Sequence, residues 1–125
     1  MKYLLDTHTI LWYAQGNDEL SKYALSLMES EDCFYSIVSL WEIAIKQKLG
    51  KLDATVTVLE LDEMCKKAGF IQLITQPIHI ERTKTLEFIH RDPFDRLLIA
   101  LAQSENLAII TRDTIIPQYD VKTVW

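Results

Sequence analysis

Four acidic side chains stand where chemistry explains them better than packing does. Asp6 directly follows the apolar run YLL, Glu42 lies early in a helix-like run, Asp95 lies near the start of another, and Asp113 follows the apolar run LAIIT. Carboxylates that converge repel one another unless a cation neutralises them, and ligand sets made only of oxygen suit Mg²⁺ or Mn²⁺ rather than zinc. We therefore predict that these four acids are catalytic and bind a divalent cation.

Each acid also has an ordinary structural interpretation. Ser39 and Glu42 have the spacing of a capping box, and Glu42 can pair with Lys46 one helical turn later. Asp113 stands where a turn can begin. Asp6 is harder to explain by packing, because it directly follows what is expected to be a central strand. The structural explanations would all have to hold at once, whereas one metal site explains the whole set.

The segment around Asp92 carries the clearest helix-start signal in the chain. Asp92 can cap the helix, Pro93 suits its first position, and Asp95 follows at the third, where negative charge meets the positive end of the helix dipole. We assign Asp92 to capping, and a second role for it as a metal ligand stays open.

Alternating patterns along the chain predict the elements that would position these acids. The predicted strands cover residues 2–6, 33–39, 70–75, 107–111 and 121–125, and the predicted helices cover 9–29 with a break at 16–21, 40–49, 57–67, 78–88 and 93–105. Strands separated by helices of this length favour a mostly parallel sheet with both faces covered. We predict an α/β fold with four to five strands, in one domain spanning residues 1–125. Ligands bind at the carboxyl ends of such strands, where the acids fall.

Composition narrows the class of protein further. The chain has 125 residues, 49% of them hydrophobic, and a formal net charge of −5. This argues against disorder and against nucleic-acid binding through a general basic surface, but not against a phosphate substrate held through a cation. No apolar run approaches the roughly 20 residues of a membrane-spanning helix, so we expect a soluble, cytoplasmic protein. Cys33 and Cys65 are expected to be buried, reduced thiols.

Four segments occur in a telling order: LLDTH at 4–8, SLWEI at 39–43, HRDPFDRLL at 90–98 and TRD at 111–113. In this combination the chain resembles the PIN domain family, and more narrowly the VapC-type ribonuclease toxins of toxin–antitoxin systems. The resemblance covers essentially the whole chain. It implies a three-layer α/β/α sandwich and Mg²⁺- or Mn²⁺-dependent hydrolysis of RNA phosphodiester bonds by an activated water.

The resemblance also assigns roles to individual residues. The family's four acids match Asp6, Glu42, Asp95 and Asp113, and hydroxyl positions that support them match Thr7 and Ser39. It further implies an RNA substrate, a cognate antitoxin and a homodimer, with the antitoxin and the second copy received near the helix that contains residues 10–13. The alternative is a non-catalytic PIN-type module that binds RNA or protein. A haloacid-dehalogenase-type phosphatase is disfavoured because His8 stands where that class needs a second acid.

Four basic residues near the acids in sequence are candidates for contacts with RNA phosphates: Lys46, Arg91, Arg96 and Arg112.

Overall fold

Five short strands form one parallel sheet in the order β3-β2-β1-β4-β5. In the computed structural model, which describes residues 1–125, these strands are β1 (Lys2–Leu5), β2 (Asp32–Tyr35), β3 (Ile71–Gln72), β4 (Ala108–Ile110) and β5 (Thr123–Val124). β1 is the central strand, with Tyr3 opposite Cys33 on one side and Ala108 on the other. The predicted parallel sheet is confirmed, and the last strand lies at its edge.

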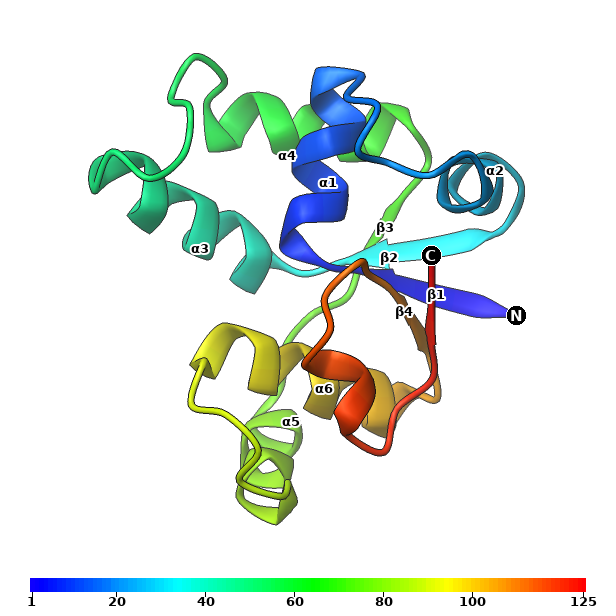
Figure 1. Ribbon diagram of the computed structural model, residues 1–125, viewed down its shortest axis with the longest axis vertical. Coiled ribbons are helices and arrows are strands. Elements are labelled where there is room, and N and C mark those ends of the chain that lie inside the picture. Colours follow the sequence, from blue (N-terminus) through cyan, green and yellow to red (C-terminus); the bar gives the residue numbers. More distant parts are fainter.

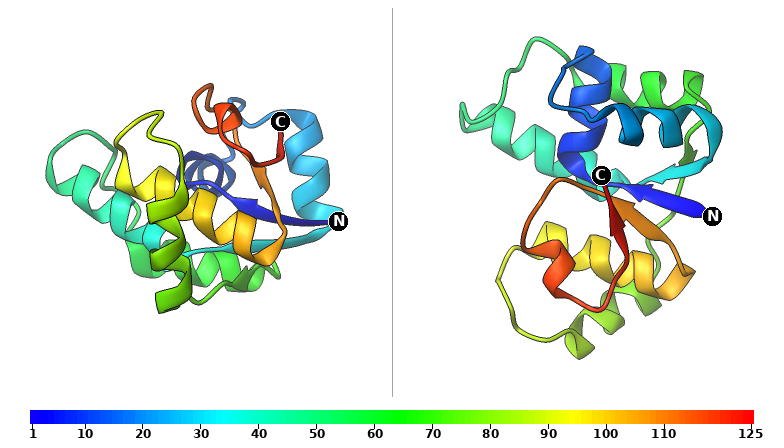
Figure 2. Two further views of the ribbon diagram at one scale, coloured as in Figure 1. Left: turned by 90° about the horizontal axis from the view of Figure 1, so that it is seen from below. Right: turned by 45° about the vertical axis from the view of Figure 1, so that its right-hand side comes forward.

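Helices cover both faces of the sheet (Figures 1 and 2). One layer contains α1 (Thr7–Gln15), α2 (Lys22–Ser30), α3 (Ile37–Lys48) and α4 (Val58–Lys67). The other contains α5 (Pro77–Arg82), α6 (Pro93–Glu105) and the 3₁₀ turns Thr83–Thr85 and Ile116–Gln118. The predicted three-layer α/β/α sandwich is therefore confirmed.

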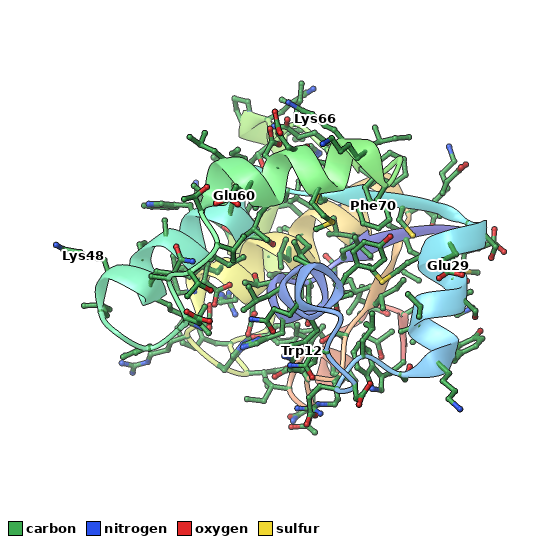
Figure 3. The ribbon with its side chains drawn as sticks, turned by 90° about the horizontal axis from the view of Figure 1, so that it is seen from above. Trp12, Glu29, Lys48, Glu60, Lys66 and Phe70 are labelled. Carbon is green, nitrogen blue, oxygen red and sulfur yellow. The ribbon has the colours of Figure 1, made fainter.

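Side chains of the central strand alternate between two cores. Tyr3 and Leu5 pack into the cluster beneath α1–α4, whereas Leu4 packs with Ile109 against α6. This alternation follows from the period of two in a strand, and it makes both faces of the sheet apolar. Figure 3 shows the first layer from above, with α1 almost end-on between α3 on the left and α2 on the right and with α4 above it.

The chain around Ser36 differs from the prediction. The predicted strand 33–39 and the Ser39 capping box are wrong, because β2 ends at Tyr35 and the Ser36 hydroxyl accepts a hydrogen bond from the backbone N–H of Val38 at 3.1 Å. Ser36 therefore caps α3, which begins three residues earlier than expected. Glu42 consequently lies in the second turn of α3 rather than in a capping position.

Two further elements are shorter than predicted, while several local predictions hold. The third strand is only Ile71–Gln72, and the helix expected over 78–88 is α5 followed by a 3₁₀ turn that ends at Thr85. The capping box of Thr57 and Glu60 is present at the start of α4. Both cysteines are buried and free, and no helix has the length and apolar character needed to cross a bilayer.

Candidate active site

Asp6 lies at the junction between β1 and α1 and is only 7% exposed. Its Oδ1 accepts a hydrogen bond from the backbone N–H of Thr9 at 2.9 Å, so Asp6 is the N-cap of α1. Burial raises the pKa of Asp6, although hydrogen bonds with Thr111 and Thr9 oppose the rise. The carboxylate is thus held inside the protein at the positive end of a helix dipole.

Glu42 is hydrogen-bonded to Thr7, the residue after Asp6, although the two lie 35 positions apart in the chain. The Thr7 hydroxyl donates to Glu42 Oε1 and the Lys46 ammonium to Oε2, both at 2.6 Å, and Glu42 is 3% exposed. Partial burial acts to lower the pKa of Lys46, but its contact with Glu42 outweighs this and raises it. Thr7 follows Asp6 directly, so one residue links the two acids. The predicted Glu42–Lys46 pair is present.

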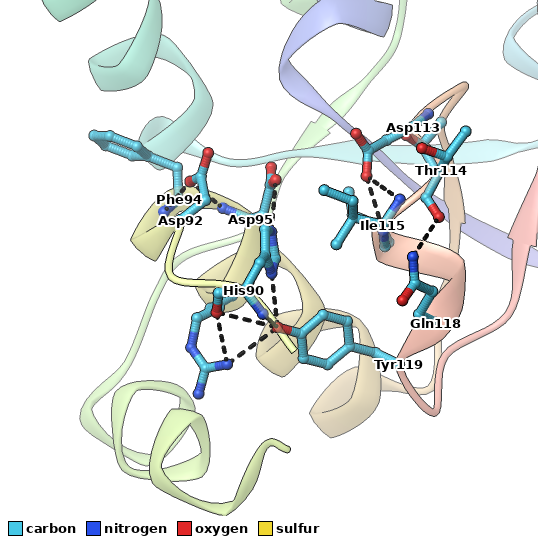
Figure 4. A network of polar contacts seen from close by, with 12 residues as sticks. His90, Asp92, Phe94, Asp95, Asp113, Thr114, Ile115, Gln118 and Tyr119 are labelled. Carbon is cyan, nitrogen blue, oxygen red and sulfur yellow. Dashed lines mark hydrogen bonds and ion pairs between the residues drawn. The ribbon is translucent and has the colours of Figure 1, made fainter. Parts of the chain in front are cut away.

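Asp92 caps α6, as predicted. Its Oδ1 accepts hydrogen bonds from the backbone N–H groups of Phe94 and Asp95, at 2.9 and 3.1 Å. This cap fixes the first turn of α6 and thereby places Asp95, whose carboxylate points up towards α3 and α1 in Figure 4.

Asp95, like Asp6, has a raised pKa. Burial raises the pKa of Asp95 to about 6, and a hydrogen bond with His90 opposes this only in part. The negative charges that add to the rise are those of Asp92, Glu42 and Asp113. Acids on α3, on α6 and after β4 therefore add, after burial, to the rise in the pKa of Asp95.

Asp113 has a structural role as well. Its Oδ2 accepts hydrogen bonds from the backbone N–H groups of Ile115 and Ile116, at 2.9 and 2.8 Å, and so holds the turn that leads into the 3₁₀ segment Ile116–Gln118 (Figure 4). It also borders the same cavity as Asp6, of about 290 Å³. The remaining lining residues of this cavity are His8, Trp12, Arg112 and Thr114.

The oxygen donors at this edge fit a hard divalent cation in type, but they do not surround one point. No group of three or more His, Cys, Asp or Glu side chains is placed to hold a metal ion together. Lys46 already pairs with Glu42, and His90 with Asp95. Ser39 Oγ is buried without a hydrogen-bond partner, one helical turn from Glu42, and is a further oxygen donor on that side.

The four basic candidates have different surroundings. Lys46 is engaged by Glu42, and Arg96 donates to three backbone carbonyl groups and to the hydroxyl of Tyr119. Arg112 lies over the Trp12 ring and pairs with Glu19, whereas Arg91 is exposed. Tyr119 escaped sequence reasoning, because it belongs to no motif and lies 29 residues from its partner His90.

The chain is similar to known proteins at the level of family and fold. The PIN domain model matches residues 3–122. No curated protein is significantly similar to this chain in sequence. Among solved structures, VapBC2 from Rickettsia felis bound to promoter DNA is similar with a TM-score of 0.73 and 14% identity, over 99% of this chain and 98% of that one. A toxin–antitoxin complex from Klebsiella pneumoniae has a TM-score of 0.66 and 21% identity over 98% and 96%. At these identities the likeness is one of fold.

Proposed function

Because this chain belongs to the PIN domain family, we propose that it is a nuclease toxin of a toxin–antitoxin pair and hydrolyses phosphodiester bonds in RNA. The observation that carries the nuclease proposal is the gathering of acids at the carboxyl end of the sheet, with the pKa of Asp95 raised to about 6. A fold that only had to be stable would not bury carboxylates near one another. The similar solved structures, described as VapBC or toxin–antitoxin complexes, support the toxin role.

In this proposal Asp6 and Asp95 hold Mg²⁺ or Mn²⁺, and Glu42 and Asp113 hold a second ion or orient the attacking water. The cation, when bound, lowers the pKa of water and offsets charge on the phosphate oxygens. The charge of a bound cation would offset the burial and the neighbouring negative charges that raise the pKa of Asp95. Thr7 and Lys46 keep Glu42 in place. No side chain has to act as a nucleophile.

The proposed protein partner is a cognate antitoxin segment. A cavity of about 620 Å³ between α1 and α2 includes Trp12, Tyr13, Leu20 and Leu25 in its lining, and it suits a segment with apolar side chains. Ile10 and Leu11 belong to the core, so only the outer half of the run 10–13 is available for such a contact. We also propose a homodimer, supported by Ile37 and Trp41, which are one turn apart on α3 and 49% and 63% exposed.

One observation favours the alternative of a non-catalytic binding module. Lys46 pairs with Glu42 and His90 with Asp95, so two of the four acids already have a partner. No three potential metal ligands are gathered around one point. A module of this kind would bind RNA or protein without cleaving it.

An assay of total RNA cleavage by the purified protein distinguishes the nuclease from the non-catalytic binding module. We expect the intact chain to cut RNA with Mg²⁺ or Mn²⁺ and not with EDTA, and Asp6→Asn to be at least about 100-fold slower, since a cation supplies several kcal/mol of transition-state stabilisation. Asp120→Asn, an exposed acid at the other end of the sheet, is the matched control and should cut normally. Cleavage that survives EDTA or Asp6→Asn contradicts the proposal. Induced expression should arrest growth with the same dependence on Asp6.

A further inference from the structure

His90 lies between a tyrosine and the candidate catalytic acid of α6. Its Nδ1 is 2.7 Å from the Tyr119 hydroxyl oxygen and its Nε2 is 3.1 Å from Asp95 Oδ2 (Figure 4). A neutral imidazole donates from one nitrogen and accepts at the other, so the direction of these two hydrogen bonds decides what His90 does to Asp95.

The surroundings of Tyr119 determine that direction. Its hydroxyl oxygen receives two N–H donors, the backbone N–H of His90 and Nη1 of Arg96, each at 3.1 Å. A hydroxyl oxygen has two lone pairs, and these two donors use both. The Tyr119 proton must therefore be donated, and His90 Nδ1 at 2.7 Å is a much closer acceptor than the His90 carbonyl oxygen at 3.4 Å.

It follows that Nδ1 of the neutral His90 ring accepts and Nε2 carries the proton. The hydrogen bonds then run in one direction, from Arg96 to Tyr119 to His90 to Asp95. The opposite tautomer would turn an imidazole N–H towards an oxygen whose lone pairs are both occupied, and it would leave Asp95 Oδ2 facing a bare nitrogen lone pair.

Further contacts hold the guanidinium of Arg96, the first donor in this series of hydrogen bonds, in place. Its guanidinium also donates to the carbonyl oxygens of Glu87 at 2.9 Å and Thr83 at 3.3 Å, and it lies 4.9 Å from the centre of the Phe88 ring. Arginine cannot give up its proton in a protein, so the first donor of the chain is permanent. Tyr119 is 6% exposed, which keeps water from replacing its hydrogen bonds.

We propose that His90 is a positioning residue: Arg96 and Tyr119 hold it as the Nε2–H tautomer, and it fixes Oδ2 of Asp95 while Oδ1, which accepts no hydrogen bond from the chain, stays available to the site. Outer hydrogen bonds of this kind orient carboxylates and tune what they bind. The use of Asp95 in catalysis rests on the proposed nuclease function, whereas the direction of the hydrogen bonds does not.

The tautomer can be measured in the intact protein by ¹⁵N NMR of the histidine side chains near pH 8, where imidazole is ordinarily neutral. We expect His90 to be protonated on Nε2 and bare on Nδ1. His79 is an internal control, since its Nδ1 accepts from the backbone N–H of Gln76 at 3.0 Å and its Nε2 lies 2.9 Å from Glu105. In Tyr119→Phe the His90 signals should move towards a mixture of tautomers, while those of His79 stay unchanged.

Titration with Mn²⁺ alone tests the effect on Asp95. Tyr119→Phe and His90→Leu should weaken Mn²⁺ binding by about 10-fold and slow RNA cleavage similarly. His90→Gln should restore most of the loss, because the amide nitrogen of Gln offers a donor in place of Nε2. Tyr23→Phe, which removes a hydroxyl from an exposed tyrosine on α2, should change neither.

Three results would decide against parts of this account. A proton on Nδ1 of His90 in the intact protein overturns the proposal. The expected tautomer with intact Mn²⁺ affinity in both Tyr119→Phe and His90→Leu overturns the positioning role. Absence of RNA cleavage by the intact protein overturns the nuclease function, and the tautomer and the Mn²⁺ affinities still decide the role of His90.

Discussion

The two ends of the parallel sheet carry charge in different ways. At the carboxyl end, Asp6 and Glu42 are buried and hydrogen-bonded, and Asp95 is partly buried. At the amino end lies the larger cavity, of about 830 Å³, against about 290 Å³ beside Asp6. Its charged lining residues, all of them exposed, are Lys2, Arg82, Glu105, Asp120 and Lys122.

Under the proposed function, burial of charge and not cavity size distinguishes the active-site end of the molecule from the other end. An exposed charge costs little free energy, whereas a buried carboxylate destabilises the fold unless partners compensate for it. The carboxyl end has helix starts at Asp6 and Asp92, whose dipoles stabilise negative charge there. At the amino end α6 stops at Glu105, and the opposite end of its dipole favours cations.

The largest effect should come from Asp95→Asn, which removes a charge at the carboxyl end of the sheet. We expect RNA cleavage to fall by about 100-fold or more, while the free energy of unfolding without divalent cation rises near pH 7 by about 1 to 2 kcal/mol. The folded chain keeps a proton on Asp95 up to a pKa of about 6, whereas an unfolded Asp loses it near about 4. Stability of the intact protein should therefore decrease as pH rises through this window, and the decrease should be smaller in Asp95→Asn.

Urea unfolding in EDTA at several pH values measures this, with Asp120→Asn as the control at the other end. The control should match the intact protein in both stability and cleavage. An Asp95→Asn chain that is no more stable than the intact one near pH 7 would show that burial and neighbouring charges do not destabilise the ionised form of Asp95.

Much of this edge could be predicted from the sequence, since Asp6 and Asp113 follow apolar runs and Asp95 opens a helix with a strong start signal. The parallel arrangement then brings them to one side of the sheet. The start of α3 could not be predicted, because Ser36 and Ser39 both lie in a run that has the character of a strand, and the end of β2 decides which hydroxyl caps. The contact between Tyr119 and His90 is set by tertiary packing across 29 residues, for which the sequence carries no local signal.

A second, smaller effect should follow from Thr7→Val, which keeps the shape of the side chain but removes the hydroxyl that donates to Glu42. A buried carboxylate oxygen then loses its donor, so we expect a loss of about 1 to 3 kcal/mol in the free energy of unfolding. Thr123→Val on the edge strand β5 is the matched control, since its hydroxyl makes no hydrogen bond and it is only partly buried. Equal losses in both variants would mean that the hydroxyl contributes nothing at the site.

The smallest effect is expected on RNA binding. It should differ between a basic residue at the carboxyl end of the sheet and one at the amino end. With cleavage blocked by Asp6→Asn, Arg112→Gln should weaken RNA binding a few-fold and lower the salt slope of log K by about 0.7 to 1, as expected for one lost phosphate contact. Lys122→Gln at the amino end should leave both unchanged. Equal effects of the two variants would mean that RNA binds over the whole surface.

A third variant, Glu19→Gln, tests the same contact by an expected gain in RNA affinity. Arg112 lies 4.5 Å from the centre of the Trp12 ring and is paired with Glu19, so an RNA phosphate has to replace a carboxylate that already holds the guanidinium. The pair is about half exposed, and exposed pairs contribute less than about 1 kcal/mol. Replacing Glu19 by a phosphate therefore has a small free-energy cost. Glu19→Gln removes the competitor and one negative charge beside the site, and RNA binding should therefore become tighter by up to about five-fold. Loss of affinity in Glu19→Gln would instead show that the Glu19 pair holds Arg112 in its binding position.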